Sequence, residues 1–240
     1  MAVNHFSDLL SFDSGFSYAS LTVGQVLVIV FIILLSIIGC AHFWRYSYED
    51  KIRHVNRTSR YVKILAEEAK KAGVYANQIT DNFLLLIYTL APMHDVGKIV
   101  VSDQILKQPR RLTSEEFEVM KKHARDGGTV VKKILDGITD EEYISFAADI
   151  ATYHHERWDG TGYPLGLRGE AIPLSARIMA IADVFDALIS KRCYKDAISV
   201  DDAFAVIESE SGTHFDPRLV DVFLQNKEKF RKASGEEQAK

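Results

Sequence analysis

The sequence predicts an all-α protein that follows one N-terminal transmembrane helix. From Lys51 onward, apolar residues recur at helical spacing, as in Tyr61, Leu65 and Ala69, which gives an amphipathic helix its apolar face. The alternation of apolar and polar residues that is typical of a half-buried strand is not sustained anywhere. A third observation, the set of helix start and stop signals along the chain, supports the same fold class.

Composition limits both the size of the core and the class of ligand. The chain has 240 residues, 47% of them apolar, and a formal net charge of -4, so it can bury one sizeable core. Long nucleic acids are disfavoured as partners, because their affinity comes from many Lys and Arg contacts. A small anionic ligand remains compatible with a local cluster of positive charge. The only two cysteines, Cys40 and Cys193, are far apart in the sequence and suggest no disulfide framework or CxxC site, which favours a reducing compartment.

The first expected element is a transmembrane helix from Thr22 to Trp44. This segment contains no Asp, Glu, Lys or Arg, and about 20 apolar residues suffice to cross a bilayer core. It is too long for the apolar region of a signal peptide, and no basic region precedes it. Arg45, Lys51 and Arg53 follow the segment, so the positive-inside rule places the rest of the chain in the cytoplasm. Residues 1–21 would then be a short extracytoplasmic N-terminus.

Helix starts are marked at three places in the cytoplasmic part. Two of them fit the capping box, in which a Ser or Thr and a Glu or Gln three residues later satisfy each other's backbone N–H groups. These are Thr113 with Glu116 and Thr139 with Glu142. The third is Asp216, which is followed by proline at the first helical position.

Glycines mark the expected helix ends, because glycine readily adopts the left-handed conformation that terminates many helices. They are Gly73, Gly137 and Gly212. The stretch from Glu156 to Pro173 is rich in glycine and proline and is long enough to suggest a functional loop. The charged end from Lys227 to Lys240 is expected to fray. The domain is placed at residues 45–231, with a flexible tail at 232–240.

Two motifs place histidines beside groups that bind metals or anions. In YHHERWDGTGYPLG, His154 and His155 stand just before the glycine-rich loop, and in PMHDVGKI, His94 and Asp95 are adjacent with Lys98 three residues later. A pair of histidines needs ligand partners elsewhere in the chain to form a metal site. On their own, such pairs are also compatible with ordinary surface residues.

Further candidate ligands lie in separate segments. His54 opens HVNR, His123 lies in MKKHARDGG, and Asp183 lies in the apolar segment AIADVFDAL. An unpaired carboxylate in an apolar helix would cost roughly several kcal/mol or lose its charge. A bound metal ion would remove that cost.

With these motifs, the chain resembles the HD-GYP family over about residues 50–224. The motifs that carry the resemblance are HVNR, HDVGK, the lone His123, HHERWDGTGYP and PLSARIMAIADVFDAL. HD-GYP proteins are the bacterial branch of the HD phosphohydrolase superfamily that hydrolyses cyclic di-GMP. The resemblance implies a bundle of about seven helices with a central metal site. It makes residues 45–231 a catalytic domain, anchored by one helix in the bacterial inner membrane.

The resemblance also implies two metal ions and assigns their ligands. The first ion is matched by His54, His94, Asp95 and Asp183, and the second by His123, His154 and His155, with Asp95 bridging the two. A ligand set of nitrogen and oxygen suits iron or manganese better than a closed zinc site. Two ions roughly 3.5–4 Å apart can activate water and stabilise an in-line displacement at phosphorus. The implied reaction is phosphodiester hydrolysis.

Substrate contacts are implied by the same matching. Tyr163 would face the substrate, and Gly160 and Gly162 would allow the backbone to turn tightly enough to present it. Lys98, Arg192 and Lys195 match the cations that hold the substrate's phosphates. The alternative for Arg192 and Lys195 is a solvated, favourably charged helix end.

Some neighbouring residues are expected to support the site. Asp186, one turn after Asp183, is assigned a catalytic role in orienting water or Lys98. Arg57 lies on the helix face of His54 and is expected to give structural support. The loop itself is expected to be held by Glu156, Arg157 and Trp158.

The sequence departs from the family pattern at a third metal ligand. Members with a third ion use a glutamate four residues before the first histidine, and here Asp50 stands at that position. Because the aspartate side chain is shorter, a third metal ion is expected to be held only weakly.

The sequence favours a membrane-anchored cyclic di-GMP phosphodiesterase that yields pGpG or GMP, and two alternatives stay open. One is a binding or scaffolding protein that holds the nucleotide, or a partner such as a GGDEF cyclase, without turnover; the intact ligand set disfavours it. The other is an HD hydrolase for a different nucleotide, which Tyr163, Arg192 and Lys195 disfavour. A homodimer is also compatible with the sequence.

Overall fold

The structure is a computed structural model and describes residues 48–106, 108, 110–190 and 197–235. Its helices, in chain order, are α2 (Tyr48–Lys71), α3 (Asp81–Leu90), η1 (Ala91–Met93), η2 (Val96–Val100), α4 (Asp103–Leu106), α5 (Ser114–Met120), α6 (Lys122–Ile134), α7 (Glu141–Tyr153), η3 (Gly169–Ala171), α8 (Leu174–Ile189), α9 (Val200–Ser209), α10 (Pro217–Gln225) and α11 (Lys227–Ser234). Within these residues the one β-type contact is an isolated bridge between Ser211 and Phe215. The predicted all-α class is confirmed for this part of the chain.

The expected transmembrane helix at residues 22–44 lies outside the described residues. Among those that are described, the segment Asp81–Val100 is long and apolar enough to span a membrane, with a mean hydropathy of 1.4. Its apolar residues include Leu86, Ile87 and Leu90, which are buried in the core of the domain. We therefore interpret this segment, which comprises α3, η1 and η2, as part of the core of the domain.

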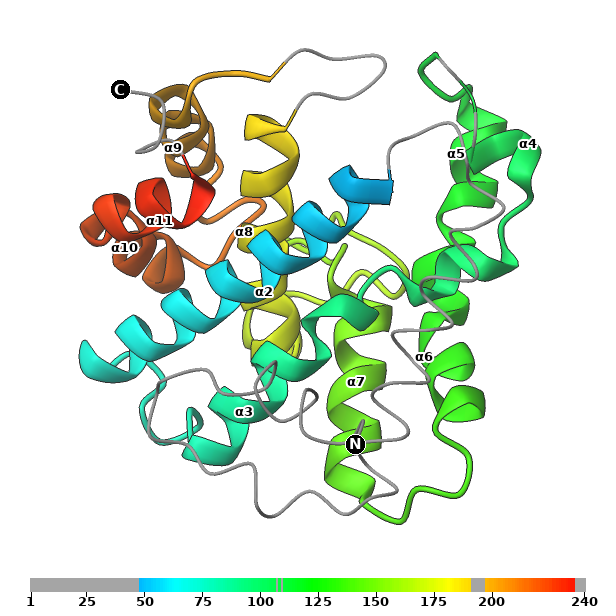
Figure 1. The fold of residues 1–240 in the computed structure, drawn as a ribbon, viewed down its shortest axis with the longest axis horizontal. Coiled ribbons are helices and arrows are strands. Elements are labelled where there is room, and N and C mark those ends of the chain that lie inside the picture. The colour runs from blue at the N-terminus through cyan, green and yellow to red at the C-terminus, as the bar shows by residue number, and fades with distance from the viewer. Residues whose placement is uncertain (1–47, 107, 109, 191–196, 236–240) are drawn as a thin grey trace, which may run out of the picture.

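Helix α2 runs through the centre of the domain and organises the packing around it (Figure 1). Its buried apolar residues follow the i, i+3, i+4 pattern of a single helix face: Tyr61, Val62, Leu65, Ala66 and Ala69. This face packs against α8, α3 and the C-terminal helices. Burial of one large apolar side chain stabilises the fold by about 1.5–3 kcal/mol. The packing of this face holds α2 against α8. Side chains from both helices meet at the candidate site.

The described residues contain more helices than the seven or so that were expected. The helical stretch around residue 121 is divided into α5 and α6, and the part after residue 199 forms the three short helices α9, α10 and α11. Short helices with few apolar residues carry a weak periodic signal, so the sequence pattern alone does not separate them.

Helix α11 corrects the prediction that the chain frays from Lys227. The helix continues to Ser234, beyond the domain boundary placed at residue 231. Its Phe230 is 1% exposed and packs against Phe223, with ring centroids 4.5 Å apart, and against Tyr61 at 6.0 Å. One buried aromatic side chain therefore anchors a segment whose composition is otherwise charged.

The helix start signals gave two correct boundaries and one wrong one. Thr113 and Glu116 form the capping box at α5, and Asp216 accepts a hydrogen bond from the backbone N–H of Arg218 at α10. The predicted box at Thr139 is wrong, because α7 is capped by the next residue, Asp140, which accepts from Tyr143 N at 3.0 Å. Aspartate is as good an N-cap as threonine, so the local sequence offered two starts one residue apart.

Glycines end the helices as expected. Gly73, Gly137 and Gly212 follow α2, α6 and α9, with φ values of +76°, +89° and +76°. These positive φ values are easily adopted by glycine and are costly for most other residues.

A second kind of glycine brings the elements of the site close together. A Cβ atom added to Gly97 in η2 would lie 1.9 Å from the carbonyl oxygen of His123 in α6. Similarly, a Cβ on Gly127 in α6 would lie 2.9 Å from the carbonyl oxygen of Ala151 in α7. Because these glycines lack a side chain, η2, α6 and α7 approach backbone to backbone. His123 of α6 thereby comes within 3.7 Å of Asp95, beside the two histidines that follow α7.

Candidate metal centre

One group of candidate ligands joins α2, η1 and α8. His54 and Asp183 project from α2 and α8, and His94 follows η1. One donor atom from each of the three lies within 4.8 Å of the others. The carboxylate oxygen Oδ1 of Asp183 is 3.8 Å from Nε2 of His54 and 3.9 Å from Nε2 of His94. Donor atoms that share one ion are about 3–4 Å apart, so this group has the spacing of a metal site.

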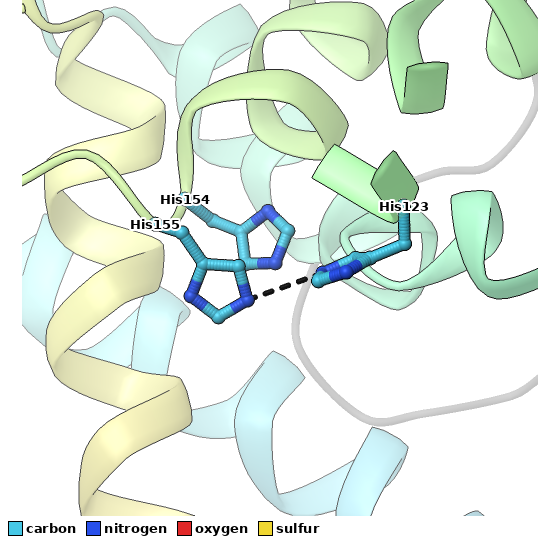
Figure 2. Close-up of side chains that lie close together, drawn as sticks. All are labelled: His123, His154 and His155. Carbon is cyan, nitrogen blue, oxygen red and sulfur yellow. Dashed lines mark hydrogen bonds between the residues drawn. The ribbon is translucent and has the colours of Figure 1, made fainter. Parts of the chain in front are cut away.

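Three histidines form a second group beside the first. Figure 2 shows the rings of His123, His154 and His155 turned toward one another, with Nε2 of His155 and Nε2 of His123 3.1 Å apart. Donor atoms of all three lie within 4.8 Å of one another. Nδ1 of His123 donates to the carbonyl of Met120 at 2.7 Å, so its Nε2 is the acceptor and His155 carries the shared proton. A metal ion at this position would replace that proton.

Asp95 lies between the two groups. Its Oδ2 is 3.4 Å from Nε2 of His94, and its Oδ1 is 3.7 Å from Nε2 of His123. Nζ of Lys98 donates to Oδ2 at 2.5 Å. Burial raises the pKa of the Asp95 carboxyl, but the positive charges of Lys98 and His94 outweigh it and hold that pKa well below its ordinary value. The carboxylate is therefore charged and has one oxygen facing each group.

Two buried nitrogen atoms in the centre have no hydrogen-bond partner among the described residues. They are Nε2 of His94 and Nε2 of His154. In each ring the other nitrogen, Nδ1, donates to a backbone carbonyl: His94 to Ala91 at 2.8 Å and His154 to Ile150 at 2.9 Å. Each ring is thus fixed with its free Nε2 pointing into the centre. Because a buried polar atom without a partner costs about 1–3 kcal/mol, these atoms fit a bound metal ion.

The protonation states of His154 and His155 also fit ligands. Burial lowers the pKa of His154 well below its ordinary value, and burial with the neighbouring His123 lowers that of His155 to about 3. Both rings are therefore neutral, as metal ligation requires. Burial lowers the pKa of His94 as well, but the adjacent Asp95 carboxylate outweighs that effect and raises it to about 8. Binding of a cation at His94 would accordingly release a proton.

Asp186 contacts His54 and Arg57, and its expected role in orienting water or Lys98 stays a prediction. The carboxylate is 1% exposed and accepts from Nδ1 of His54 at 2.7 Å and from Nε of Arg57 at 2.5 Å. Arg57 also donates to Ser190 at 2.8 Å. Burial raises the pKa of the Asp186 carboxyl, but the hydrogen bonds from His54 and Arg57 lower it by more, so the group is charged. Asp186 therefore orients the His54 ring so that its Nε2 faces Asp183.

The glycine-rich loop is held by a buried carboxylate. Glu156 is 2% exposed and accepts from the backbone N–H groups of Leu165 at 2.7 Å and Leu167 at 3.0 Å. Arg157 donates to Glu210 at 2.8 Å. These contacts confirm that Glu156 and Arg157 hold the loop.

The two glycines of the loop serve different purposes. Gly160 has a φ of +82°, which is a left-handed turn. At Gly162 a Cβ atom would lie 2.3 Å from the backbone nitrogen of Arg157, so the loop can close on itself only without a side chain there. Together they bring Tyr163 back toward the end of α7.

Tyr163 lies directly against the three-histidine group. Its ring stacks on that of His155, with centroids 4.9 Å apart and an interplanar angle of 29°. Burial raises the pKa of the Tyr163 hydroxyl, so the group remains a hydrogen-bond donor. Phe117 of α5 also contacts the Tyr163 ring, edge to face with centroids 6.1 Å apart, and Lys121, between α5 and α6, lies 5.5 Å from its centroid. The sequence analysis missed Phe117 and Lys121, although both stand in the segment FEVMKKH that leads into His123.

The structure thus brings together seven of the predicted ligands: His54, His94, Asp95, His123, His154, His155 and Asp183. It also brings Lys98 and Tyr163 to the same centre. Arg192, Lys195 and the side chain of Asp50 lie outside the described residues, so their assigned roles stay predictions.

Sequence comparison places this arrangement in a known family. The HD domain family matches residues 49–219, which include the full set of ligands gathered at the centre. This chain belongs to the HD domain family. The HD domain here is similar to a cyclic di-GMP phosphodiesterase of Vibrio cholerae serotype O1, with 49% identity over 177 residues, covering 74% of this chain and 36% of the relative. The predicted relation to HD-GYP proteins is confirmed.

Other relatives of this HD domain differ in substrate. A 3'3'-cGAMP-specific phosphodiesterase 2 of Vibrio cholerae is 37% identical over 177 residues, covering 74% of this chain and 31% of the relative. The chain thus spans about a third of the length of these curated relatives. A solved structure described as Bd1817, a HDG"Y"P protein from Bdellovibrio bacteriovorus, has a TM-score of 0.51 and 20% identity. It covers 82% of this chain and 59% of that one, and it supports the fold alone.

Proposed function

We propose that this HD domain is a metal-dependent phosphodiesterase that hydrolyses cyclic di-GMP to pGpG, GMP or both. The observation that carries the proposal is the convergence of seven nitrogen- and oxygen-donor side chains on one centre. Two of their buried imidazole nitrogens have no hydrogen-bond partner in the part of the chain that the structure describes. The name of the 49% identical relative supports the substrate.

Two cations are proposed for the centre. His54, His94 and Asp183 would hold one, the three histidines of Figure 2 would hold the other, and Asp95 would bridge them. Ions bound there would supply Lewis acidity for attack of water at phosphorus. Iron or manganese is the proposed metal, because the donors are imidazoles and carboxylates without a thiolate.

The side chains around the ligands have separate tasks in this mechanism. Asp186, held by Arg57, fixes the ring of His54. The ammonium group of Lys98 lies at Asp95, from where it would donate to a phosphate oxygen of a bound substrate. The protonated hydroxyl of Tyr163 can donate to the substrate from the rim of the centre.

The membrane anchor remains part of the proposal. Residues 22–44 carry no charged side chain, and basic residues follow them. This pattern supports a single-pass protein of the bacterial inner membrane with its HD domain in the cytoplasm. A reporter fused after Trp44 should behave as cytoplasmic, and a periplasmic signal from that fusion would overturn the topology.

A second candidate substrate is another cyclic dinucleotide. The name of the 37% identical relative favours 3'3'-cGAMP as the specific alternative. The chemistry at phosphorus would be the same, and discrimination would lie in the contacts to the bases. A third outcome is binding without hydrolysis, in which the domain serves as a scaffold, for example for a GGDEF cyclase.

One experiment separates these outcomes. The full chain, purified in detergent and loaded anaerobically with iron or manganese, is incubated with cyclic di-GMP or with 3'3'-cGAMP, and the products are separated by chromatography. Hydrolysis of cyclic di-GMP at the higher kcat/KM supports the proposal, and the opposite preference supports the alternative. Intact cyclic di-GMP after incubation with fully metal-loaded protein would refute the hydrolytic function.

A further inference from the structure

The last turn of α5 places an exposed aromatic side chain next to Tyr163. Phe117 is 43% exposed, and its ring stands nearly perpendicular to that of Tyr163, at 87°. Nζ of Lys121 lies 5.1 Å from the centroid of Phe117 and 5.5 Å from that of Tyr163. Tyr163 in turn stacks on His155. Phe117 is therefore two ring contacts away from the proposed metal centre.

We propose that Phe117 and Lys121 form the subsite that receives a guanine base of the substrate. Phe117 provides the stacking surface, and Lys121 donates to the acceptor atoms at the edge of the base. This inference rests on the proposed function, because it assigns a specificity-determining role at the same site. Tyr163 would lie between the base and the phosphate.

The position of Phe117 favours a stacked base as its partner. Single exposed apolar side chains are common on protein surfaces and need no explanation. Phe117 differs because its ring stands edge to face with that of Tyr163, which stacks on His155 in the proposed metal centre. Protein aromatic rings are general stacking surfaces for nucleobases. We expect a base to reach the ring of Phe117 when its ribose is attached to a phosphate bound at the three-histidine group.

The start of the helix that carries Phe117 is held by side-chain hydrogen bonds. The capping box of Thr113 and Glu116 fixes the start of α5, and Arg110 donates to both carboxylate oxygens of Glu116 at 2.7 and 2.8 Å. A stacking surface that is already ordered loses little entropy when a ligand binds.

Lys121 is suited to recognise guanine at the edge of this surface. Its ammonium group pairs with Glu118 at 2.6 Å, and the side chain of Glu118 is 68% exposed. Exposed ion pairs of this kind contribute little to stability, so Lys121 can exchange partners. Guanine presents two acceptors, O6 and N7, to a lysine, whereas adenine replaces one of them with an amino donor.

Binding of mononucleotides to the metal-loaded full chain tests the subsite without any need for turnover. The probes are GMP, AMP and ribose 5-phosphate, which has the sugar phosphate but no base. Phe117→Leu should weaken GMP binding by about 10-fold and leave ribose 5-phosphate unchanged, and Phe117→Tyr should restore GMP affinity. Lys121→Met should weaken GMP binding several-fold and weaken AMP binding less, because adenine keeps only one of the two acceptors.

Tyr88 supplies a matched control. It is an exposed aromatic residue (41%) on α3, and Lys63 lies 5.4 Å from its ring centroid, as Lys121 does near Phe117. Tyr88→Leu should change none of these affinities. Equal weakening of GMP and ribose 5-phosphate by Phe117→Leu, or no weakening at all, would overturn the stacking role. Equal weakening of GMP and AMP by Lys121→Met would overturn the guanine contact. Base-dependent binding in a chain that fails to hydrolyse cyclic di-GMP would refute the proposed function but leave the subsite standing.

Discussion

Asp186 accepts a hydrogen bond from Nδ1 of His54 at 2.7 Å while Arg57 holds its other oxygen at 2.5 Å. This arrangement links α8 to α2 and determines which nitrogen of His54 faces the metal centre. Mutation of a residue that hydrogen-bonds the second ring nitrogen of a metal-ligating histidine lowers metal affinity by about 10–100-fold.

The first prediction follows from this contact. Asp186→Asn keeps the size of the side chain but removes the charge that Arg57 and His54 share, so the metal affinity of the first group should fall by roughly 10-fold or more. Metal titration with elemental analysis measures the effect. Asp149→Asn, at a half-buried aspartate of α7, is the matched control. Equal metal affinity in Asp186→Asn and in the wild type would show that Asp186 does not position His54.

The second prediction separates the bridging ligand from a ligand of one group. Asp95→Ala should lose both metals and all hydrolysis, because Asp95 faces both groups. Asp183→Ala removes a ligand only from the group with His54 and His94, so one metal per chain should remain. Metals are counted by elemental analysis after anaerobic loading. Normal turnover by Asp95→Ala would contradict the two-metal mechanism.

The third prediction concerns the contact between η2 and α6. The Cβ of Gly97→Ala would lie 1.9 Å from the carbonyl oxygen of His123, and neither backbone can yield without moving a ligand. We expect a loss of about 1–3 kcal/mol in unfolding free energy together with weaker metal binding. In Gly128→Ala the new atom meets the rotatable hydroxyl of Thr152 at 2.5 Å, so a smaller loss is expected. Urea denaturation of the metal-free proteins compares the two, and the reverse order would refute the steric argument.

The fourth prediction concerns pH. Burial and the nearby Arg157, opposed by Glu210, together lower the pKa of His214 to about 4. Its ring stacks on Phe215 at 4.1 Å in the neutral form. The unfolded chain, with an ordinary histidine pKa near 6.5, binds the proton more readily. Stability should therefore decrease as pH falls from about 6.5 to 4, by at most about 1.4 kcal/mol per pH unit for this one group.

His214→Gln tests that contribution directly. The variant keeps a polar side chain that does not titrate in this range, so its unfolding free energy should depend less steeply on pH than that of the wild type. The difference between the two slopes, measured by denaturation at several pH values, isolates His214 from the other histidines. If the unfolding free energies of the two proteins depend on pH equally steeply, His214 does not contribute to the loss of stability at low pH.

Local pattern predicted the helices, and motif resemblance predicted the ligands. Periodicity was sufficient for α2, whose buried residues repeat along one face, but not for α11, which is fixed by the single buried side chain of Phe230. The ligands were found because each stands in a short motif. The contacts between Asp186 and His54, and between Phe117 and Tyr163, join segments far apart in the chain. Such contacts depend on how helices pack, which no local pattern specifies.

The ligands around Asp95 come from helices spread over much of the folded domain, including α2 near its start and α8 far along the chain. A cation shared by such remote segments would act as a cross-link, and the unfolded chain would have no equivalent site. By thermodynamic linkage, each tenfold rise in free metal above the dissociation constant would add about 1.4 kcal/mol to the stability of the domain. The supply of metal would then govern how long the protein survives proteolysis as well as how fast it works.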